Sequence, residues 1–247
     1  MEPYRNPPIR EALVDIKIEP LTASYLRTLD GLHDQLRDRY PIKKTRHRWV
    51  GSVETQEDRL ISAAQKYLGS DGFMFISADE QRILQLRLDG FTLNYLRPYP
   101  AEGWPVVREE AERMWTLFAE AVSPTTTIRI GLRYINEINV PMPQIDLDEY
   151  LTAAPRIPTD LPQTLDRYLT QVVIPYPNLE AKAIITQSTG NPSDPNSTSI
   201  ILDIDVFTDV PRKADSRLVW NILDQFRGIK NRIFKSSLHR KTEELFK

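Results

Sequence analysis

Cysteine is absent from this chain of 247 residues, and glycine and histidine are scarce, with nine and three residues. The lack of thiols excludes disulfides, thiolate nucleophiles and cysteine-based zinc sites, and it is typical of a cytoplasmic protein. The histidines (His33, His47 and His239) form no i, i+4 pair, so we expect no catalytic zinc site. Neither a GxSxG nucleophile motif nor a glycine-rich phosphate loop occurs. The sequence therefore predicts no catalytic residue, metal or cofactor, and favours a protein that is not an enzyme.

Long hydrophobic runs are also missing. No window approaches the roughly 20 apolar residues of a transmembrane helix, and residues 1–20 carry prolines and charges where a signal peptide needs an apolar segment. We therefore expect a soluble, cytoplasmic protein without membrane association. The formal net charge is −2, so any basic patch that attracts nucleic acid must be local.

The clearest pattern present is the alternation of apolar and polar residues from Thr127 to Val140. Successive side chains of a strand point to opposite faces. The apolar side chains fall on one face: Ile128, Ile130, Leu132, Tyr134, Ile138 and Val140. The polar side chains fall on the other: Arg129, Arg133, Glu137 and Asn139. We expect this strand to pack one face on a core and to present charge on the other.

The same periodicities predict the remaining elements. Strands are expected over residues 12–18, 42–53, 60–68, 73–77, 83–97, 165–175, 179–187 and 198–208. Helices are expected over residues 24–40, 104–122, 147–153 and from 214 onward. If it continues to Phe246, the last helix would span about 45 Å, although Ser236 and Ser237 are a plausible interruption. Residues 69–72 and 79–80 are expected to form turns, and residues 188–198 an exposed loop.

Runs of strands separated by few helices indicate an α+β fold with largely antiparallel sheets. Pro141 and Pro143 mark a junction, which predicts two packed halves, residues 1–141 and 142–247. Each half is expected to be a largely antiparallel sheet with helices on one face, and the second ends in the long C-terminal helix. Both halves contain strands followed by a helix with a tryptophan (Trp115 and Trp220), which suggests an ancient duplication.

The charged strand faces supply the candidate binding residues: Arg129, Arg133, Asn136, Asp203 and Asp205. If the other half of the molecule covers these faces, they form a polar cleft that binds an anionic or amide-bearing ligand through bidentate arginine contacts. The alternative is a solvated sheet face with cross-strand ion pairs, each contributing a fraction of a kcal/mol. The sequence favours the second interpretation without excluding the first.

Two shorter motifs point to other chemistry. Glu180 and Lys182, on a predicted strand, are similar to half of a metal-dependent nuclease site, with Asp166 as the required upstream carboxylate. So short a match is common by chance. The basic segment Lys43 to Trp49 suits phosphate contact and base stacking, but an edge strand protected by Lys and Arg has the same composition.

Three segments carry a resemblance to a known family: PPIREALVDIKIEP, GLRYINEINVP and LVWNILDQFRGIKNRIFKSSLHRKTEELF. The chain resembles a sporadically distributed prokaryotic family of proteins of about this length and of unknown function. The matching positions are Pro8, Glu11, Ala12, Arg133, Tyr134, Asn136, Trp220 and Phe234. The resemblance implies no activity, but a patchy distribution is typical of horizontally transferred defence and toxin–antitoxin genes.

Three functions follow as hypotheses. The first is a non-enzymatic binding protein whose partner is a protein, encoded by an adjacent gene in a defence or toxin–antitoxin-like pair. The second is an enzyme or sensor for a small anionic or nucleotide ligand in a cleft between the halves. The third, nucleic-acid binding, is not favoured because the net charge is slightly negative.

Overall fold

The computed structural model describes residues 4–56, 59–141, 146–163, 165–191 and 197–247, with only the backbone described for 50–66. Ten strands form one antiparallel sheet in the order β2-β3-β4-β5-β1-β6-β9-β8-β7, and β10 pairs with β6. Their bounds are β1 Ile9–Ile18, β2 Ile42–Gln56, β3 Arg59–Ile76, β4 Arg82–Arg87, β5 Gly90–Leu96, β6 Thr126–Pro141, β7 Leu169–Tyr176, β8 Ala181–Thr189, β9 Ser197–Thr208 and β10 Arg212–Lys213. The predicted α+β class with a largely antiparallel sheet is confirmed.

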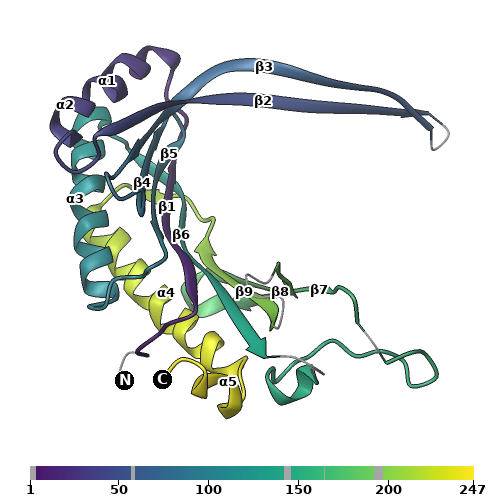
Figure 1. Ribbon diagram of the computed structural model, residues 1–247. Helices are drawn as coiled ribbons and strands as arrows, with labels where there is room; N and C mark the ends of the chain where they lie inside the picture. Colours follow the sequence, from purple (N-terminus) through teal and green to yellow (C-terminus); the bar gives the residue numbers. More distant parts are fainter. Residues whose placement is uncertain (1–3, 57–58, 142–145, 164, 192–196) are drawn as a thin grey trace.

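The helices are α1 Leu26–Gly31, α2 His33–Leu36, α3 Trp104–Val122, α4 Ser216–Ser236 and α5 Arg240–Glu244, with short 3-10 turns at Ala23–Tyr25, Leu147–Glu149 and Pro177–Leu179. The long helices α3 and α4 cover one face of the sheet (Figure 1). They bury Trp115 and Trp220 against the apolar face of the central strands, which supplies Val14, Leu132 and Ile204. The alternation seen in the sequence therefore places the core on the helix side. No helix among the described residues is long and apolar enough to cross a membrane.

The strand order is symmetric about the β1–β6 pair. β1 is flanked by β5, the strand that precedes α3, and β6 is flanked by β9, which is separated from α4 only by the two-residue strand β10. On each side the remaining strands run outward in reverse chain order. Instead of the two sheets expected, one continuous sheet joins residues 1–141 and 142–247, because β6 pairs with β9 from Ile130 to Pro141.

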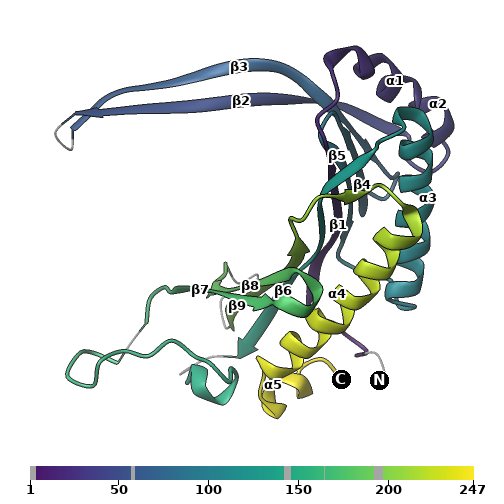
Figure 2. The same ribbon diagram turned by 180° about the vertical axis from the view of Figure 1, so that it is seen from behind.

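Two parts of the sheet project away from the helices. β2 and β3 form a long hairpin arm (Figures 1 and 2). β7, β8 and β9, at the other end of the sheet, form the second projecting part. The turn predicted at residues 69–72 is wrong, because these residues continue β3. They lie opposite the part of β2 around His47, where the pairing of the two strands shifts register. Gly72 is required by close packing, since a Cβ atom there would lie 2.2 Å from the carbonyl oxygen of Leu86.

The strand predicted over residues 83–97 is two strands, β4 and β5, which reverse at Leu88 and Asp89. Gly90 permits this reversal with φ of 146°, and it lies against the backbone of β1. The turn expected at residues 79–80 is present.

The helix predicted over residues 104–122 is confirmed as α3, whereas residues 24–40 form a 3-10 turn and two short helices in place of one helix. The C-terminal helix ends at Ser236, the predicted interruption, and α5 follows separately, so it is not continuous to Phe246. Residues 147–153 form a 3-10 turn and a single β-bridge from Leu151 to Leu238 in place of the expected helix. Of the expected loop at residues 188–198, residues 192–196 lie outside the described residues, whereas Ser188 and Thr189 belong to β8 and Ser197 and Thr198 to β9.

Candidate functional site

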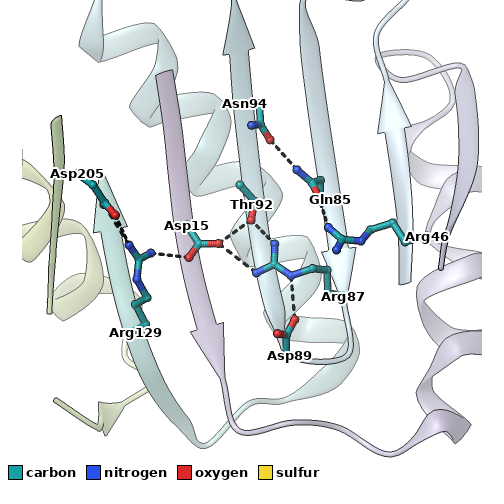
Figure 3. Close-up of polar contacts among 9 residues, drawn as sticks. All are labelled: Asp15, Arg46, Gln85, Arg87, Asp89, Thr92, Asn94, Arg129 and Asp205. Atoms are coloured by element: carbon teal, nitrogen blue, oxygen red, sulfur yellow. Dashed lines mark hydrogen bonds and ion pairs between the residues drawn. The ribbon is translucent and has the colours of Figure 1, made fainter. Parts of the chain in front are cut away.

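The face of the sheet opposite α3 and α4 carries a row of charged and polar side chains that contact one another across several strands (Figure 3). These are the positions between the buried residues of β1, β6 and β9. Four of the five predicted binding residues lie in this row: Arg129, Arg133, Asp203 and Asp205. The alternation of each strand is sufficient to bring them to one face.

Arg129 is held between carboxylates of two neighbouring strands. Its Nη1 donates to Asp15 Oδ2 at 2.6 Å, and its Nη2 donates to both carboxylate oxygens of Asp205 at 3.0 and 2.9 Å. The guanidinium also lies over the ring of Phe207, 4.8 Å from its centroid. Gly131 makes this position available, because a Cβ atom there would lie 2.4 Å from Arg129 Nη1. The sequence IRIGLR thus places a glycine under the arginine that bridges β1 and β9.

Asp15 is the centre of the row. It accepts hydrogen bonds from Arg87 Nη2 at 3.0 Å and from Thr92 Oγ1 at 2.7 Å, in addition to the bond from Arg129. Arg87 is largely buried, with 8% of its side chain exposed, and its Nε also donates to Asp89 at 2.8 Å. Burial alone would raise the pKa of Asp15, but the positive charges of Arg87 and Arg129 and the Thr92 hydrogen bond lower it below 3.8.

Arg133 forms a separate bidentate pair with Asp203. Its Nε and Nη2 donate to the two carboxylate oxygens of Asp203 at 2.9 and 2.5 Å. The side chain of Arg133 is 44% exposed. Burial raises the pKa of Asp205 despite the nearby positive charges of Arg129 and Arg133. Arginine forks that are already filled by carboxylates leave little capacity for an anionic ligand on this face.

Uncharged side chains extend the row toward the arm. Gln85 Nε2 donates to Asn94 Oδ1 at 3.0 Å, and Asn94 Nδ2 donates to Glu11 Oε1 at 2.6 Å. Arg46 of β2 donates to Gln85 and lies 3.4 Å from Asp71. The polar row therefore runs from β2 to β9 (Figure 3).

Asn136 does not join this row, and its expected placement beside Arg133 on one face is wrong. A residue three positions along a strand points to the opposite side. Asn136 is buried on the helix side, with 2% exposure, and its Nδ2 donates to the carbonyl oxygen of Leu202 at 3.0 Å.

The nuclease-like motif is also not assembled. Glu180 precedes β8 in a left-handed conformation (φ 49°) and accepts from Arg212 at 2.6 Å. Lys182 donates instead to Asp209 at 3.1 Å. Among the residues that the structure describes, no three His, Asp or Glu side chains gather as a metal site would require.

The basic segment of β2 is partly neutralised. Lys43 pairs with Asp30 at 2.8 Å, and Arg46 is engaged in the polar row. His47 Nδ1 lies 3.0 Å from the hydroxyl of Tyr67, and the ring of Trp49 packs 4.9 Å from that of Tyr67. The arrangement resembles a protected edge strand more than a phosphate-binding surface.

A cavity of about 920 Å³ lies elsewhere, where the N-terminal segment and residues 97–105 meet the end of β6 and the second half of α4. The sequence interpretation missed it because its walls come from segments that are far apart in the chain. Three positions that carry the family resemblance line it, Pro8, Asn136 and Phe234. That coincidence is the one sequence signal that could have found it.

Comparison with known proteins adds no function. No protein-family model and no curated protein matches the chain. The resemblance to the sporadically distributed prokaryotic family therefore stays a prediction.

Proposed function

We propose that the chain is a non-enzymatic, cytoplasmic binding protein whose partner is another protein, encoded by an adjacent gene in a defence or toxin–antitoxin-like pair. The observation that carries the proposal is the edge strand β7. Among the residues that the structure describes, it pairs with β8 alone, so the backbone groups of its other side can pair with a further strand.

β7 is apolar on both faces. Leu169 and Val173 point to the side of the polar row, with 73% and 56% of their surface exposed, and Val172 and Ile174 are exposed on the opposite side. No charged residue occurs between Leu169 and Tyr176. A long, uncharged and exposed edge strand is a template for strand addition.

The opposite edge of the sheet differs in the expected way. β2 carries Lys43, Lys44, Arg46 and Arg48, which protect an edge against pairing. The contrast supports β7 as the edge that binds a partner. An extended segment of that partner would add beside Leu169–Ile174, since Pro175 ends the stretch able to donate continuously.

The two alternatives have less support. On the polar row, ligand binding would have to displace the carboxylates that already fill Arg129 and Arg133. Nucleic-acid binding by β2 predicts an affinity that falls steeply with salt, and a flat salt response would remove it.

The experiment is co-purification with the product of the adjacent gene, compared among three forms of the chain. Val173→Lys places a charge on the β7 edge and should abolish the complex. Leu161→Lys alters an equally exposed leucine in the preceding loop and should retain it. Neither change should alter the free energy of unfolding by more than about 0.5 kcal/mol, because both side chains are exposed. Absence of any complex, or equal binding by both variants, would overturn the proposal.

We also infer that the chain arose by duplication of a strand–helix unit, with repeats over residues 1–122 and 126–236. The symmetric strand order about β1 and β6 supports this, as does the final helix of each unit, α3 or α4. This boundary differs from the division predicted at residue 141.

A further inference from the structure

The cavity beside α4 is rich in positive charge. Five basic side chains line it: Arg5, Arg97, Arg227, Lys230 and Lys235. Two acidic side chains line it: Glu102 and Glu137. Glu137 is engaged by Arg97 at 3.2 Å and by Ser199 at 3.3 Å. The remaining basic groups therefore face the cavity with little compensation.

Lys230 is the most unusual of these groups. Its Nζ lies 3.9 Å from the centroid of the Tyr134 ring, and the Tyr134 hydroxyl is 2.9 Å from that of Tyr99. Among the described residues, no carboxylate forms an ion pair with Lys230 or with Arg227, which lies one turn earlier on α4. Burial, and secondarily the charge of Arg227, lower the pKa of Lys230 to about 7. A largely buried ammonium group without a counterion releases its proton more readily, and a ligand that supplies negative charge would stabilise the charged form.

The rest of the lining is suited to a flat apolar group. Tyr4, Trp104, Phe234 and Phe246 contribute aromatic surface, and Asn231 and Asn139 add amide groups. A volume of about 920 Å³ is in the range of small-molecule sites. Apolar walls with a few convergent polar groups are the usual composition of such sites.

We propose that this cavity binds a small organic anion, in which a phosphate or carboxylate group contacts Lys230 and Arg227 and a flat apolar body packs on the aromatic walls. The site is separate from the β7 edge and does not depend on the protein-binding proposal. Binding of the anion would stabilise the charged form of Lys230, so binding above pH 7 takes up protons.

The test uses the full chain and three probes of similar size, measured by calorimetry and thermal denaturation. Phenyl phosphate and benzoate carry the two anionic groups, and benzyl alcohol is the neutral control. At least one anion should bind about tenfold or more tightly than benzyl alcohol, because the neutral probe lacks the charged contact with Lys230 and Arg227. Equal binding of all three probes, or no binding of either anion, would overturn the proposal.

Matched variants on α4 locate the site. Lys230→Met should weaken anion binding about tenfold or more and remove the proton uptake, whereas Lys230→Arg should retain binding. Arg232→Met, which alters an exposed side chain on the same helix outside the cavity, should bind as the wild type does. Lys230 has no ion-pair partner among the described residues, so its replacement leaves no buried charge unpaired and should not prevent folding. An unchanged affinity in Lys230→Met would therefore contradict the site. Val173→Lys should bind the anion normally, which separates this test from that of the β7 edge.

Discussion

Asp15 shows how one side chain ties the sheet together. It lies on β1, between β5 and β6, and contacts Arg87 on one side and Arg129 on the other. Through Arg129 it is linked to Asp205 on β9. The ion pairs of the polar row therefore connect the strands of the sheet to one another, which is a structural role.

Replacement of Asp15 by Asn should lower the free energy of unfolding by about 2 to 3 kcal/mol, because it leaves the largely buried Arg87 short of a carboxylate. Urea denaturation at pH 7 measures the change. Asp209→Asn is the control, since that carboxylate is exposed and its pair with Lys182 should contribute little. The lowered pKa of Asp15 means that its contribution is present at neutral pH and is lost as the pH falls below 3.8. Equal stability of both variants would contradict the role of Asp15.

Lys230 gives a pH dependence of the same sign in a higher pH range. Its pKa falls from 10.5 to about 7 on folding, so the unfolded chain binds this proton more tightly than the folded protein does. Stability should therefore rise between pH 7 and 9, by at most about 1.4 kcal/mol per pH unit. The rise should be smaller in Lys230→Met, measured by urea denaturation at each pH. The same slope in both proteins would show that Lys230 keeps its ordinary pKa.

At the residue scale the sequence predicts which polar side chains share a face but not which of them pair. Arg129 and Asp205 were expected in one sheet because both alternate with apolar residues. Their contact depends on the register of β6 with β9, a pairing between segments far apart in the chain. The central position of Asp15 depends in the same way on β5 and β6 together.

At the scale of single elements, strong periodicity predicts well and turn residues predict less well. α3 has a continuous apolar stripe and no internal glycine, and it was predicted within its bounds. Residues 24–40 have a similar stripe, but α1 ends at Gly31. Gly69 and Gly72 lie in an irregular region of β3 and not in a turn. Composition alone does not distinguish these two uses of glycine.

Two glycines should respond oppositely to alanine. In Gly90→Ala the new Cβ would lie 2.3 Å from the carbonyl oxygen of Ile16 and would force a φ of 146°, so a loss of about 2 kcal/mol or more is expected. Gly228→Ala lies in α4 with no atom within 4 Å and should be stabilising by up to about 1 kcal/mol. Thermal and urea denaturation of the two variants measure both effects. A tolerated Gly90→Ala would contradict the close approach of β5 to β1.

At the scale of the whole molecule, one sheet carries its long helices, α3 and α4, on the same side, as far as the described residues show. The helix-free face is bordered by the arm and by the β7–β9 end, both of which project from it (Figure 2). The cavity is a whole-molecule feature as well, since it joins the N-terminal segment to α4. Neither arrangement could be read from the sequence, because each depends on how distant segments pack.

Because one continuous sheet joins residues 1–141 and 142–247, we expect that neither part folds independently of the other. A fragment of residues 142–247 would lose β6, which pairs with β9 and packs on α4. Circular dichroism of this fragment should show no cooperative unfolding transition. A fragment with a sharp transition would instead support residues 1–141 and 142–247 as independent domains.

The measurement that tests the central claim most directly is hydrogen exchange of β7 in the complex with the adjacent gene product. If the partner adds a strand to this edge, the amides of Leu169–Ile174 that point away from β8 should exchange more slowly in the complex, while those on the free edge of β2 should not change. Unchanged exchange in β7, with protection confined to another surface, would contradict the account.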